Sequence, residues 1–423
     1  MMRIQKLKEY GIPAGIIEQW EKHYGPELLS LQHRAVVEGG VLSGRSLVVS
    51  GATSSGKTLV GEMAAIQRAA RHEKVIYLVP LKSLAEEKYR QFVRTYGAYG
   101  LRILVSHRDR QTHDESLRQG QFDLAVVVYE KLQALLAREP DLLREVRLVV
   151  VDELQTVGDP ERGGDLEILL TRILRDAKHR GGPFQMVGLS AVLGNPDELA
   201  RWLEAGLLIH PERPLELRRG VLFGTHYQYH ETNSGLVGHE ILATPNSTAG
   251  DGLSEDTLDV SDTDPYHGEE VRRAALFFAA ESLESTLVFV PTRLLSRHWA
   301  QMASDESNLP AAVESLRRLD VMEPSAARDI LAQQLEKGVA FHNSDLGPEL
   351  RSIVEEGFRS GEIKLLFCTA TLAQGVNLAA KNTIIVPETY RYSERSGGFV
   401  SYSLPINELE NQGGRAGRPG TGD

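Results

Sequence analysis

The sequence predicts an α/β protein built from two doubly wound parallel-sheet domains in tandem, and two features of the chain support this. Short, nearly continuous apolar runs rich in Val, Ile and Leu alternate with longer stretches of helical character. Such runs are typical of parallel strands that helices cover on both faces. The alternation stops near Pro211 and resumes near Glu270, so the chain contains two such series.

Each expected strand is an apolar, β-branched run that ends at a turn or polar residue. The first series has five, at 46–50, 74–79, 123–128, 147–151 and 185–189, with a helix over 57–71. The second has four, at 285–290, 338–341, 363–368 and 382–386. We therefore expect a helical lead-in over 1–30, a first domain over 31–215, a crossover with an acidic insert over 216–269, and a second domain over 270–423. A small β-hairpin and a loop are expected within 221–265.

Composition narrows the class of protein. The net charge of −11 argues against a global basic field, so any nucleic acid has to be held locally. No run of about 18 apolar residues is present, which predicts no membrane partner. One cysteine, Cys368, and an N-terminus without an apolar signal region predict a cytoplasmic protein, or a nuclear one in a eukaryote.

A glycine-rich loop after the first expected strand predicts a nucleotide site. It has the full G-x-x-x-x-G-K-[ST] pattern and reads Gly51-Ala52-Thr53-Ser54-Ser55-Gly56-Lys57-Thr58. Glycines let backbone N–H groups turn towards phosphates, and the following helix adds positive charge at its N-terminus. Lys57 is expected between the β- and γ-phosphates of ATP, and the hydroxyl of Thr58 on magnesium.

Two adjacent acids, Asp152 and Glu153, follow the apolar strand at 147–151. Two carboxylates there are costly to bury without a cation, and a magnesium–nucleotide complex provides one. Asp152 is expected to hold the metal and Glu153 to orient or deprotonate the attacking water. The pair alone is a weak signal, because acids often cap helices, but it gains weight from the phosphate loop upstream.

With the order of the remaining motifs, these residues resemble superfamily 2 helicases of the DExH type. The closest branch contains archaeal and eukaryotic DNA repair helicases and exosome-associated RNA helicases, and the resemblance runs from about Leu31 to Gly420. It implies two RecA-like domains and an ATP-dependent helicase or translocase that moves 3′→5′ along single-stranded or forked DNA or RNA. Gln155 stands where the family usually has His, and Val192 where it usually has Thr, which removes one hydroxyl from the link between the nucleotide and strand sites.

The resemblance also implies roles for individual residues. Gln32, in a stretch similar to the Q motif, would read adenine; the less favoured alternative is an ordinary helix-surface glutamine. Gly375 of motif V would also lie at the nucleotide. Gln412, Arg415 and Arg418 of motif VI would complete the catalytic set. The two arginines, three residues apart, are expected to share a helix face and to act as arginine fingers on the γ-phosphate.

Nucleic-acid contacts are implied at the ends of several strands. Before the hairpin region they are Pro80, Lys82, Ser83, Tyr129, Lys131, Thr292, Arg293 and Thr369. Alternating aromatic residues around Gly397-Gly398 predict a β-hairpin over 388–403. In the resembled branch such a hairpin separates the duplex, so Tyr390, Tyr392, Phe399 or Tyr402 would stack on the last base pair. A hairpin that packs into the core is an equal alternative.

Two rival functions remain open at this stage. One is a strand-stimulated ATPase that remodels or clamps without unwinding, and the other is an ATP-gated binding module that does not hydrolyse. The composition of the acidic insert favours a solvated loop. The alternatives are that it docks a protein partner or shields the strand channel. The chain stops at Asp423, just past motif VI, where the resemblance implies further domains, from a longer protein or from another polypeptide.

Overall fold

The computed structural model describes residues 2–52, 55–159, 162–191, 194–213, 215–242, 268–281, 283–370, 372, 378–393 and 398–417. The chain forms two compact units, Met1–Pro214 and Leu215–Asp423. The acidic insert beyond residue 242 lies outside the described residues.

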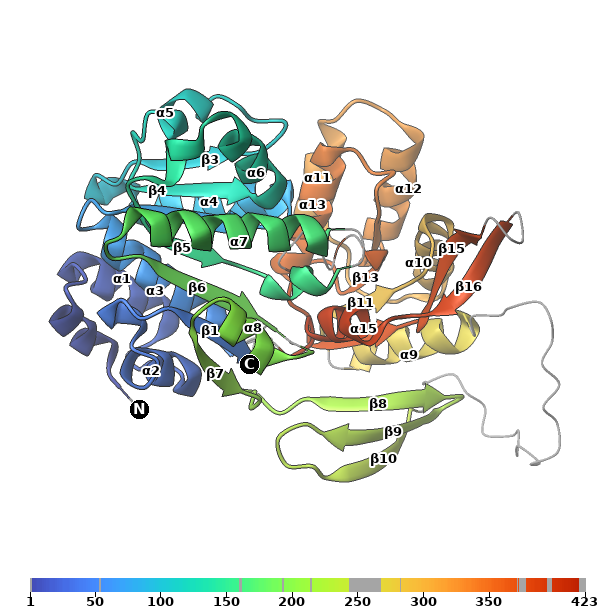
Figure 1. Cartoon of the computed structure of the whole chain (residues 1–423). Helices are drawn as coiled ribbons and strands as arrows, with labels where there is room; N and C mark the ends of the chain where they lie inside the picture. Colours follow the sequence, from blue (N-terminus) through green and yellow to red (C-terminus); the bar gives the residue numbers. More distant parts are fainter. Residues whose placement is uncertain are drawn as a thin grey trace. The chain divides into compact units, whose positions relative to one another are not determined.

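The first unit is built on a seven-stranded sheet of order β3-β4-β2-β5-β6-β1-β7, in which every pairing is parallel (Figure 1). Its strands are β1 (Leu47–Gly51), β2 (Lys74–Val79), β3 (Ile103–Ser106), β4 (Leu124–Val128), β5 (Val146–Val151), β6 (Gln185–Ser190) and β7 (Gly206–His210). The five predicted strands are present. The two edge strands, β3 and β7, were not predicted.

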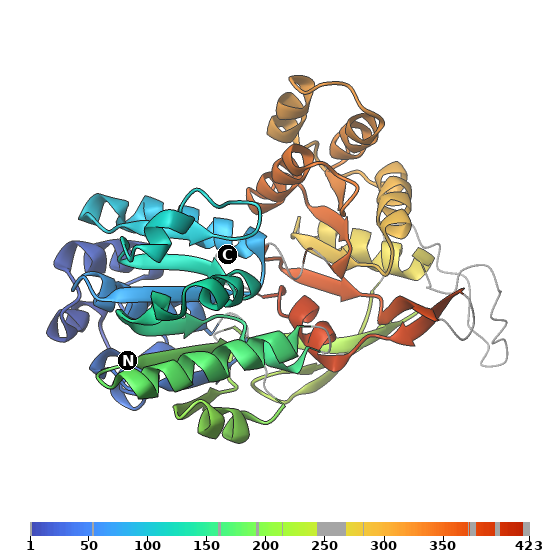
Figure 2. The same cartoon turned by 45° about the horizontal axis from the view of Figure 1, so that its top comes forward.

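Helices cover both faces of this sheet, as Figure 2 shows. One core joins alternate strand residues such as Val49, Tyr77 and Val150 to η1 (Ile4–Tyr10), α1 (Ala14–Tyr24), α2 (Ser30–Val37), η2 (Val41–Ser43), α3 (Lys57–Ala69) and α4 (Lys82–Tyr96). The other joins the intervening strand residues to α5 (Asp114–Arg118), α6 (Tyr129–Arg138), η4 (Pro140–Leu143), η5 (Leu154–Gly158), α7 (Gly163–Arg180) and α8 (Pro196–Trp202). The remaining turn, η3, spans Gly97–Tyr99. Two buried faces explain why these strands are apolar at nearly every position.

The second unit contains a four-stranded parallel sheet of order β12-β13-β11-β14. Its strands are β11 (Thr286–Phe289), β12 (Val339–His342), β13 (Leu365–Cys368) and β14 (Asn382–Ile385). Its helices are α9 (Gly268–Glu281), α10 (Arg293–Glu306), α11 (Val313–Asp320), α12 (Ala326–Leu335), α13 (Pro348–Arg359) and α15 (Ile406–Gly413). The two parallel sheets confirm the predicted α/β class. Within the described part of the chain, no helix is both long and apolar enough to cross a bilayer.

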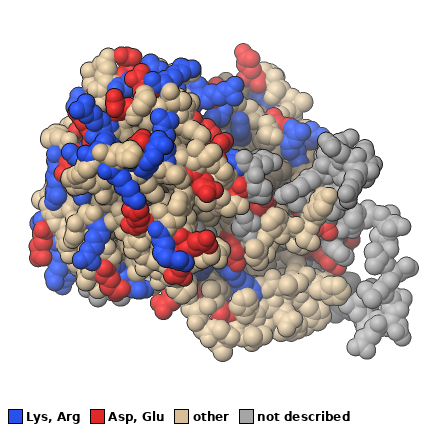
Figure 3. Space-filling model, in the orientation of Figure 1, with Lys and Arg blue, Asp and Glu red and all other residues tan. Residues whose placement is uncertain are grey.

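A three-stranded antiparallel sheet, rather than a single hairpin, follows the first unit: β8 (Arg218–Phe223), β9 (His226–Glu231) and β10 (Val237–Ile241). Arg219 of β8 forms a two-pronged ion pair with Glu410 of α15, at 2.5 and 2.8 Å, which joins this sheet to the motif VI helix. One face exposes Val221, Phe223 and Val237, and Figure 3 shows this region almost free of charged side chains. Over the first unit in the same view, basic and acidic side chains are interspersed, without a continuous basic field.

The predicted hairpin between motifs V and VI is present. Strands β15 (Glu388–Ser393) and β16 (Gly398–Ser403) pair antiparallel, with Tyr392 opposite Phe399. Its tip, residues 394–397, lies outside the described residues. The side chains of Tyr390, Tyr392 and Phe399 are not described, so stacking on bases stays a prediction.

Candidate active site

The phosphate loop lies between β1, which ends at Gly51, and α3, which begins at Lys57. Gly56 has φ +85°, and a Cβ there would lie 2.2 Å from the side-chain nitrogen of Gln32, so only glycine fits. Ser55 is 2% exposed, and its hydroxyl has no hydrogen-bond partner among the described residues. Thr53 and Ser54 lie outside the described residues. A buried hydroxyl without a partner in a loop of this shape fits a ligand oxygen.

Lys57 folds back onto its own loop. Its ammonium donates hydrogen bonds to the carbonyl oxygens of Gly51 at 2.6 Å and Ala52 at 2.7 Å. Thr58, in the first turn of α3, is exposed. The ammonium therefore lies at the mouth of the loop, and it has to leave these carbonyls to reach a phosphate.

Gln32 contacts the phosphate loop directly. It is buried on α2, its carbonyl oxygen accepts from the Leu29 backbone N–H at 2.9 Å, and its amide donates to the Gly56 carbonyl at 3.2 Å. It is therefore not a helix-surface glutamine. These bonds hold the loop, and a contact with adenine stays a prediction.

Asp152 follows β5 and is 8% exposed. The phenol of Tyr77 donates to its carboxylate at 3.0 Å, as does the Glu153 backbone N–H at 3.1 Å, and the Tyr129 hydroxyl donates to its backbone carbonyl. Burial, and next the neighbouring charge of Glu153, raise the pKa of Asp152 to about 6. A buried carboxylate that resists ionisation is suited to a divalent cation, which supplies the missing positive charge.

Glu153 has φ +54°, a left-handed conformation that costs a non-glycine residue about 1–2 kcal/mol. Its carboxylate accepts from the Gln155 amide, and the Gln155 carbonyl oxygen accepts from the Ser190 hydroxyl at 2.7 Å and the Ala191 N–H at 3.3 Å. Gln155 thus links Glu153, in the acid pair after β5 (motif II), to Ser190 and Ala191 at the end of β6 (motif III). Val192 lies outside the described residues.

The pKa of Asp152 predicts how metal affinity depends on pH. Because only the carboxylate form holds Mg²⁺ well, the apparent Mg²⁺ affinity should be flat above pH 7 and fall as the pH drops through about 6. The expected limiting slope is about tenfold per pH unit. The Mg²⁺ concentration for half-maximal ATPase, measured from pH 5 to 8 where the protein stays folded, checks this. An unchanged value across that range would contradict it.

Replacing Gln155 tests the link between the two motifs. Gln155→Ala should lower kcat for ATP by roughly tenfold to a hundredfold with little change in KM, because Glu153 loses its side-chain partner and its orientation. The matched control is Gln185→Ala. Gln185 lies at the start of β6, at the opposite end from Ser190, and its buried amide donates hydrogen bonds to the Val41 and Arg45 carbonyls. The control should lower the unfolding temperature and leave kcat unchanged. Equal kcat losses in both variants would reject a catalytic link.

The positions predicted to contact nucleic acid in the first unit differ in exposure and in the partners they already have. Lys82 and Ser83 are exposed in the first turn of α4, where Lys82 pairs with Asp109 at 2.5 Å. Pro80 is buried, and its carbonyl accepts from Arg162. Tyr129 is 3% exposed and Lys131 is largely buried in an ion pair with Asp114. The side chains of Pro80, Tyr129 and Lys131 are already packed or paired inside the unit, and their contact with nucleic acid stays a prediction.

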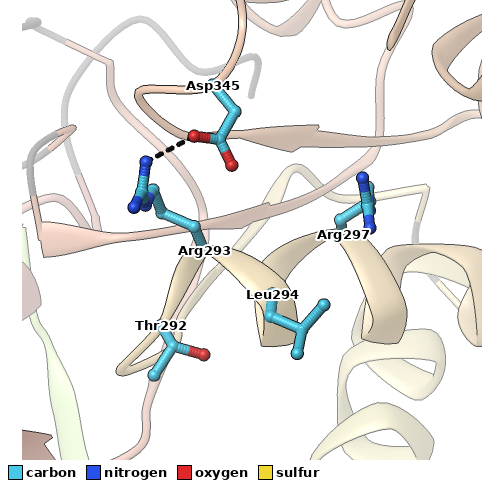
Figure 4. Close-up of a pocket in the computed structure, with 5 residues that line it drawn as sticks. All are labelled: Thr292, Arg293, Leu294, Arg297 and Asp345. Atoms are coloured by element: carbon cyan, nitrogen blue, oxygen red, sulfur yellow. Dashed lines mark hydrogen bonds and ion pairs between the residues drawn. The ribbon is translucent and has the colours of Figure 1, made fainter. Parts of the chain in front are cut away.

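In the second unit, Thr292 caps α10 by accepting from the Leu295 N–H at 3.2 Å. The helix start borders a pocket of about 330 Å³ lined by Thr292, Arg293, Leu294, Arg297 and Asp345 (Figure 4). Arg293 reaches across to Asp345 at 2.5 Å, while Arg297 stands one turn further along the helix. Two exposed arginines at a helix N-terminus suit a phosphate group.

The motif V and VI residues of this unit lie at the ends of strands and helices. Thr369 follows β13 and is buried, as is Gln412 in α15. Arg415 is also buried, and its carbonyl accepts from the Ala380 N–H at 3.0 Å. Because α15 ends at Gly413, Arg415 lies in the turn beyond it, and the expectation of a shared helix face with Arg418 was wrong for this residue. Gly375 and Arg418 lie outside the described residues.

Some residues at the site were missed from the sequence. Tyr77 donates to Asp152 from inside β2, Arg162 pairs with Glu130, and Arg297 lines the pocket. A phenol within an otherwise aliphatic strand was the one available signal for Tyr77, since a buried tyrosine hydroxyl needs a partner.

Comparisons with known proteins agree with this geometry. Residues 30–199 match the family model described as DEAD/DEAH box helicase, and residues 280–420 match the helicase conserved C-terminal domain. Curated proteins named ATP-dependent DNA helicase Hel308 from Pyrococcus horikoshii and Pyrococcus abyssi are each 34% identical, over 98% of this chain and 52% and 51% of theirs. One of that name from Methanococcus vannielii is 31% identical over 94% of this chain and 50% of its own. The chain spans about half the length of these relatives.

Proposed function

This chain belongs to superfamily 2 of the helicases, and we propose that it is the ATP-hydrolysing motor of a DNA helicase. The proposal rests on one observation: the phosphate loop, the acid pair Asp152-Glu153 and Ser190 all lie at the same edge of the first sheet. In a parallel sheet all carboxyl ends lie at the same edge, so the loop after β1, Ser190 after β6 and the acids after β5 are neighbours.

Each residue at this edge has a role in the proposal. Lys57 and the loop amides would bind the β- and γ-phosphates, and Gln32 would keep the loop in shape. Glu153, oriented by Gln155, would take the proton of the attacking water. Gln412, Arg415 and Arg418 of the second unit would stabilise charge on the γ-phosphate.

Magnesium fits the residues that are present. Asp152 and the exposed hydroxyl of Thr58 are the oxygen donors that Mg²⁺ prefers, and the raised pKa of Asp152 is relieved by a cation. When bound, the ion would neutralise charge on the phosphates. Within the described residues, no three or more His, Cys, Asp and Glu side chains are grouped so that they could hold a metal ion.

The proposed track is single-stranded or forked DNA, because the relatives described above are named as DNA helicases. Lys82 and Ser83 in the first unit, and Thr292, Arg293 and Arg297 in the second, would bind backbone phosphates. Movement 3′→5′, a cytosolic location and a protein partner for residues 243–267 stay part of the proposal.

The track and the class of activity can be tested together. ATPase should rise when poly-dT is added to the protein with Mg²⁺, and poly-U should stimulate less. Stimulation by poly-U alone would move the proposal to RNA. No hydrolysis under any condition, with ATP still bound, would leave an ATP-gated binding module instead.

A strand-stimulated ATPase that does not unwind is the second candidate. A deletion in the β15–β16 hairpin distinguishes this candidate from a helicase. Deleting residues 391–402 should abolish unwinding of a forked duplex and leave poly-dT-stimulated ATPase within about twofold, because a separating hairpin acts on the duplex and not on ATP. A strand-displacement assay beside an ATPase assay checks this. Unchanged unwinding would reject the hairpin as the separating element.

A further inference from the structure

Helix α4 carries a lysine that is buried inside the first unit. Lys88 is 7% exposed, and its ammonium lies 5.9 Å from the centre of the Tyr77 ring and 5.7 Å from that of Phe92. Its ammonium donates a hydrogen bond to the Gln91 side-chain oxygen at 3.3 Å. A buried ammonium loses its water, so aromatic faces and nearby carboxylates have to compensate.

Tyr77 connects this lysine to the nucleotide site. The same ring that lies under the ammonium carries the hydroxyl that donates to the Asp152 carboxylate at 3.0 Å. The charge of Lys88 also favours the ionised form of Asp152, lowering its pKa against the larger effects of burial and Glu153. Lys88 therefore acts on Asp152 both through a shared tyrosine and through its charge.

A second buried carboxylate, Glu62 of α3, also feels the charge of this lysine. It is 1% exposed and accepts from the Tyr96 hydroxyl and from the Gln91 amide at 3.2 Å, and Tyr96 in turn accepts from Trp20 at 2.6 Å. Lys88 lowers the pKa of Glu62, which burial raises. Lys88 could thus serve only to neutralise Glu62, and an experiment has to separate that structural role from an action on Asp152.

The first turn of α4 presents Lys82 and Ser83, the proposed strand contacts, and Lys88 lies six residues further along the same helix. A helix of this length moves as a unit, and six residues span about 9 Å. We propose that Lys88 is a positioning residue that links the strand-binding end of α4 to Asp152 through Tyr77, so that a bound strand changes how the site uses Mg²⁺. This inference rests on the proposed function.

The experiment measures the Mg²⁺ concentration for half-maximal binding of a fluorescent, non-hydrolysable ATP analogue, with and without single-stranded oligo-dT, and in parallel that for half-maximal ATPase. In the wild-type protein the strand should lower this concentration by about fivefold or more, the usual lower range for coupled sites. Lys88→Met, similar in length but uncharged, should lose the shift, and Lys88→Arg should keep most of it. The matched control is Lys74→Met at the start of β2, whose ammonium lies 6.0 Å from the Phe122 ring, and it should behave as wild type.

The double variant Lys88→Met/Glu62→Gln removes both buried charges and separates the two roles. If the inference holds, the double variant folds and still lacks the shift. Three results would overturn the inference: a strand-dependent shift of wild-type size in Lys88→Met, a restored shift in the double variant, or no shift in the wild-type protein. In each case, ATP hydrolysis by the wild-type protein would leave the proposed function intact. Absence of any wild-type ATPase would overturn both.

Discussion

Lys57→Ala should reduce ATP hydrolysis by about 10³-fold or more, because no other described cation lies in the loop to meet the charge that develops on the transferring phosphoryl group. The fold should survive. The two hydrogen bonds lost to Gly51 and Ala52 leave carbonyls at a partly exposed loop mouth, where each contributes about 1 kcal/mol or less.

Steady-state ATPase and an unfolding temperature measured on the same preparation check this prediction. Lys178→Ala is the control, since Lys178 is an exposed lysine in the last turn of α7 that pairs with Glu204. It should match wild type in both measurements. Hydrolysis by Lys57→Ala within about tenfold of wild type would mean that Lys57 does not act on the phosphates.

Glu153→Gln should give the second largest effect and a different pattern. Removing a general base is expected to lower kcat by about 10²–10⁴-fold. The affinity for ATP should change little, because the amide keeps the shape of the side chain and can still accept from Gln155. The variant should therefore bind ATP and DNA without turning over.

Single-turnover hydrolysis and binding of a fluorescent ATP analogue, recorded in parallel, distinguish this outcome. Glu145→Gln is the matched control, because Glu145 is an exposed acid that pairs with Lys74 away from the nucleotide site. A comparable loss of ATP binding in Glu153→Gln would indicate that Glu153 serves the metal or the fold rather than the water.

The central strands could be predicted because a strand buried on both faces needs apolar residues at nearly every position. Strand β2 begins and ends where its apolar run does, since both of its neighbours in the sheet are parallel and both of its faces are covered. Edge strand β3 was missed although all four of its residues are buried, because its apolar run is only three residues long. Edge strand β7 escaped prediction for the complementary reason. Strand β7, with one neighbour and exposed Ile209, mixes apolar and exposed positions within five residues.

The site could be predicted where a motif ties chemistry to local backbone, and not where tertiary contacts decide. Gly56 and Lys57 lie in one loop, so their arrangement follows from sequence order. Lys131 was predicted to contact nucleic acid, but its partly buried ion pair with Asp114, 17 residues earlier, could not be inferred from the sequence. Tyr77 lies 75 residues before Asp152 in sequence, and only the sheet brings them together.

The account rests on a nucleotide held by Lys57, Asp152 and Glu153 and completed by arginines of the second unit. A crystal structure of the protein with Mg²⁺, a non-hydrolysable ATP analogue and oligo-dT tests this most directly. We predict the Lys57 ammonium and the guanidinium of Arg415 or Arg418 within hydrogen-bond distance of the γ-phosphate oxygens. A nucleotide bound on Lys57 with both guanidinium groups turned to solvent would contradict the account.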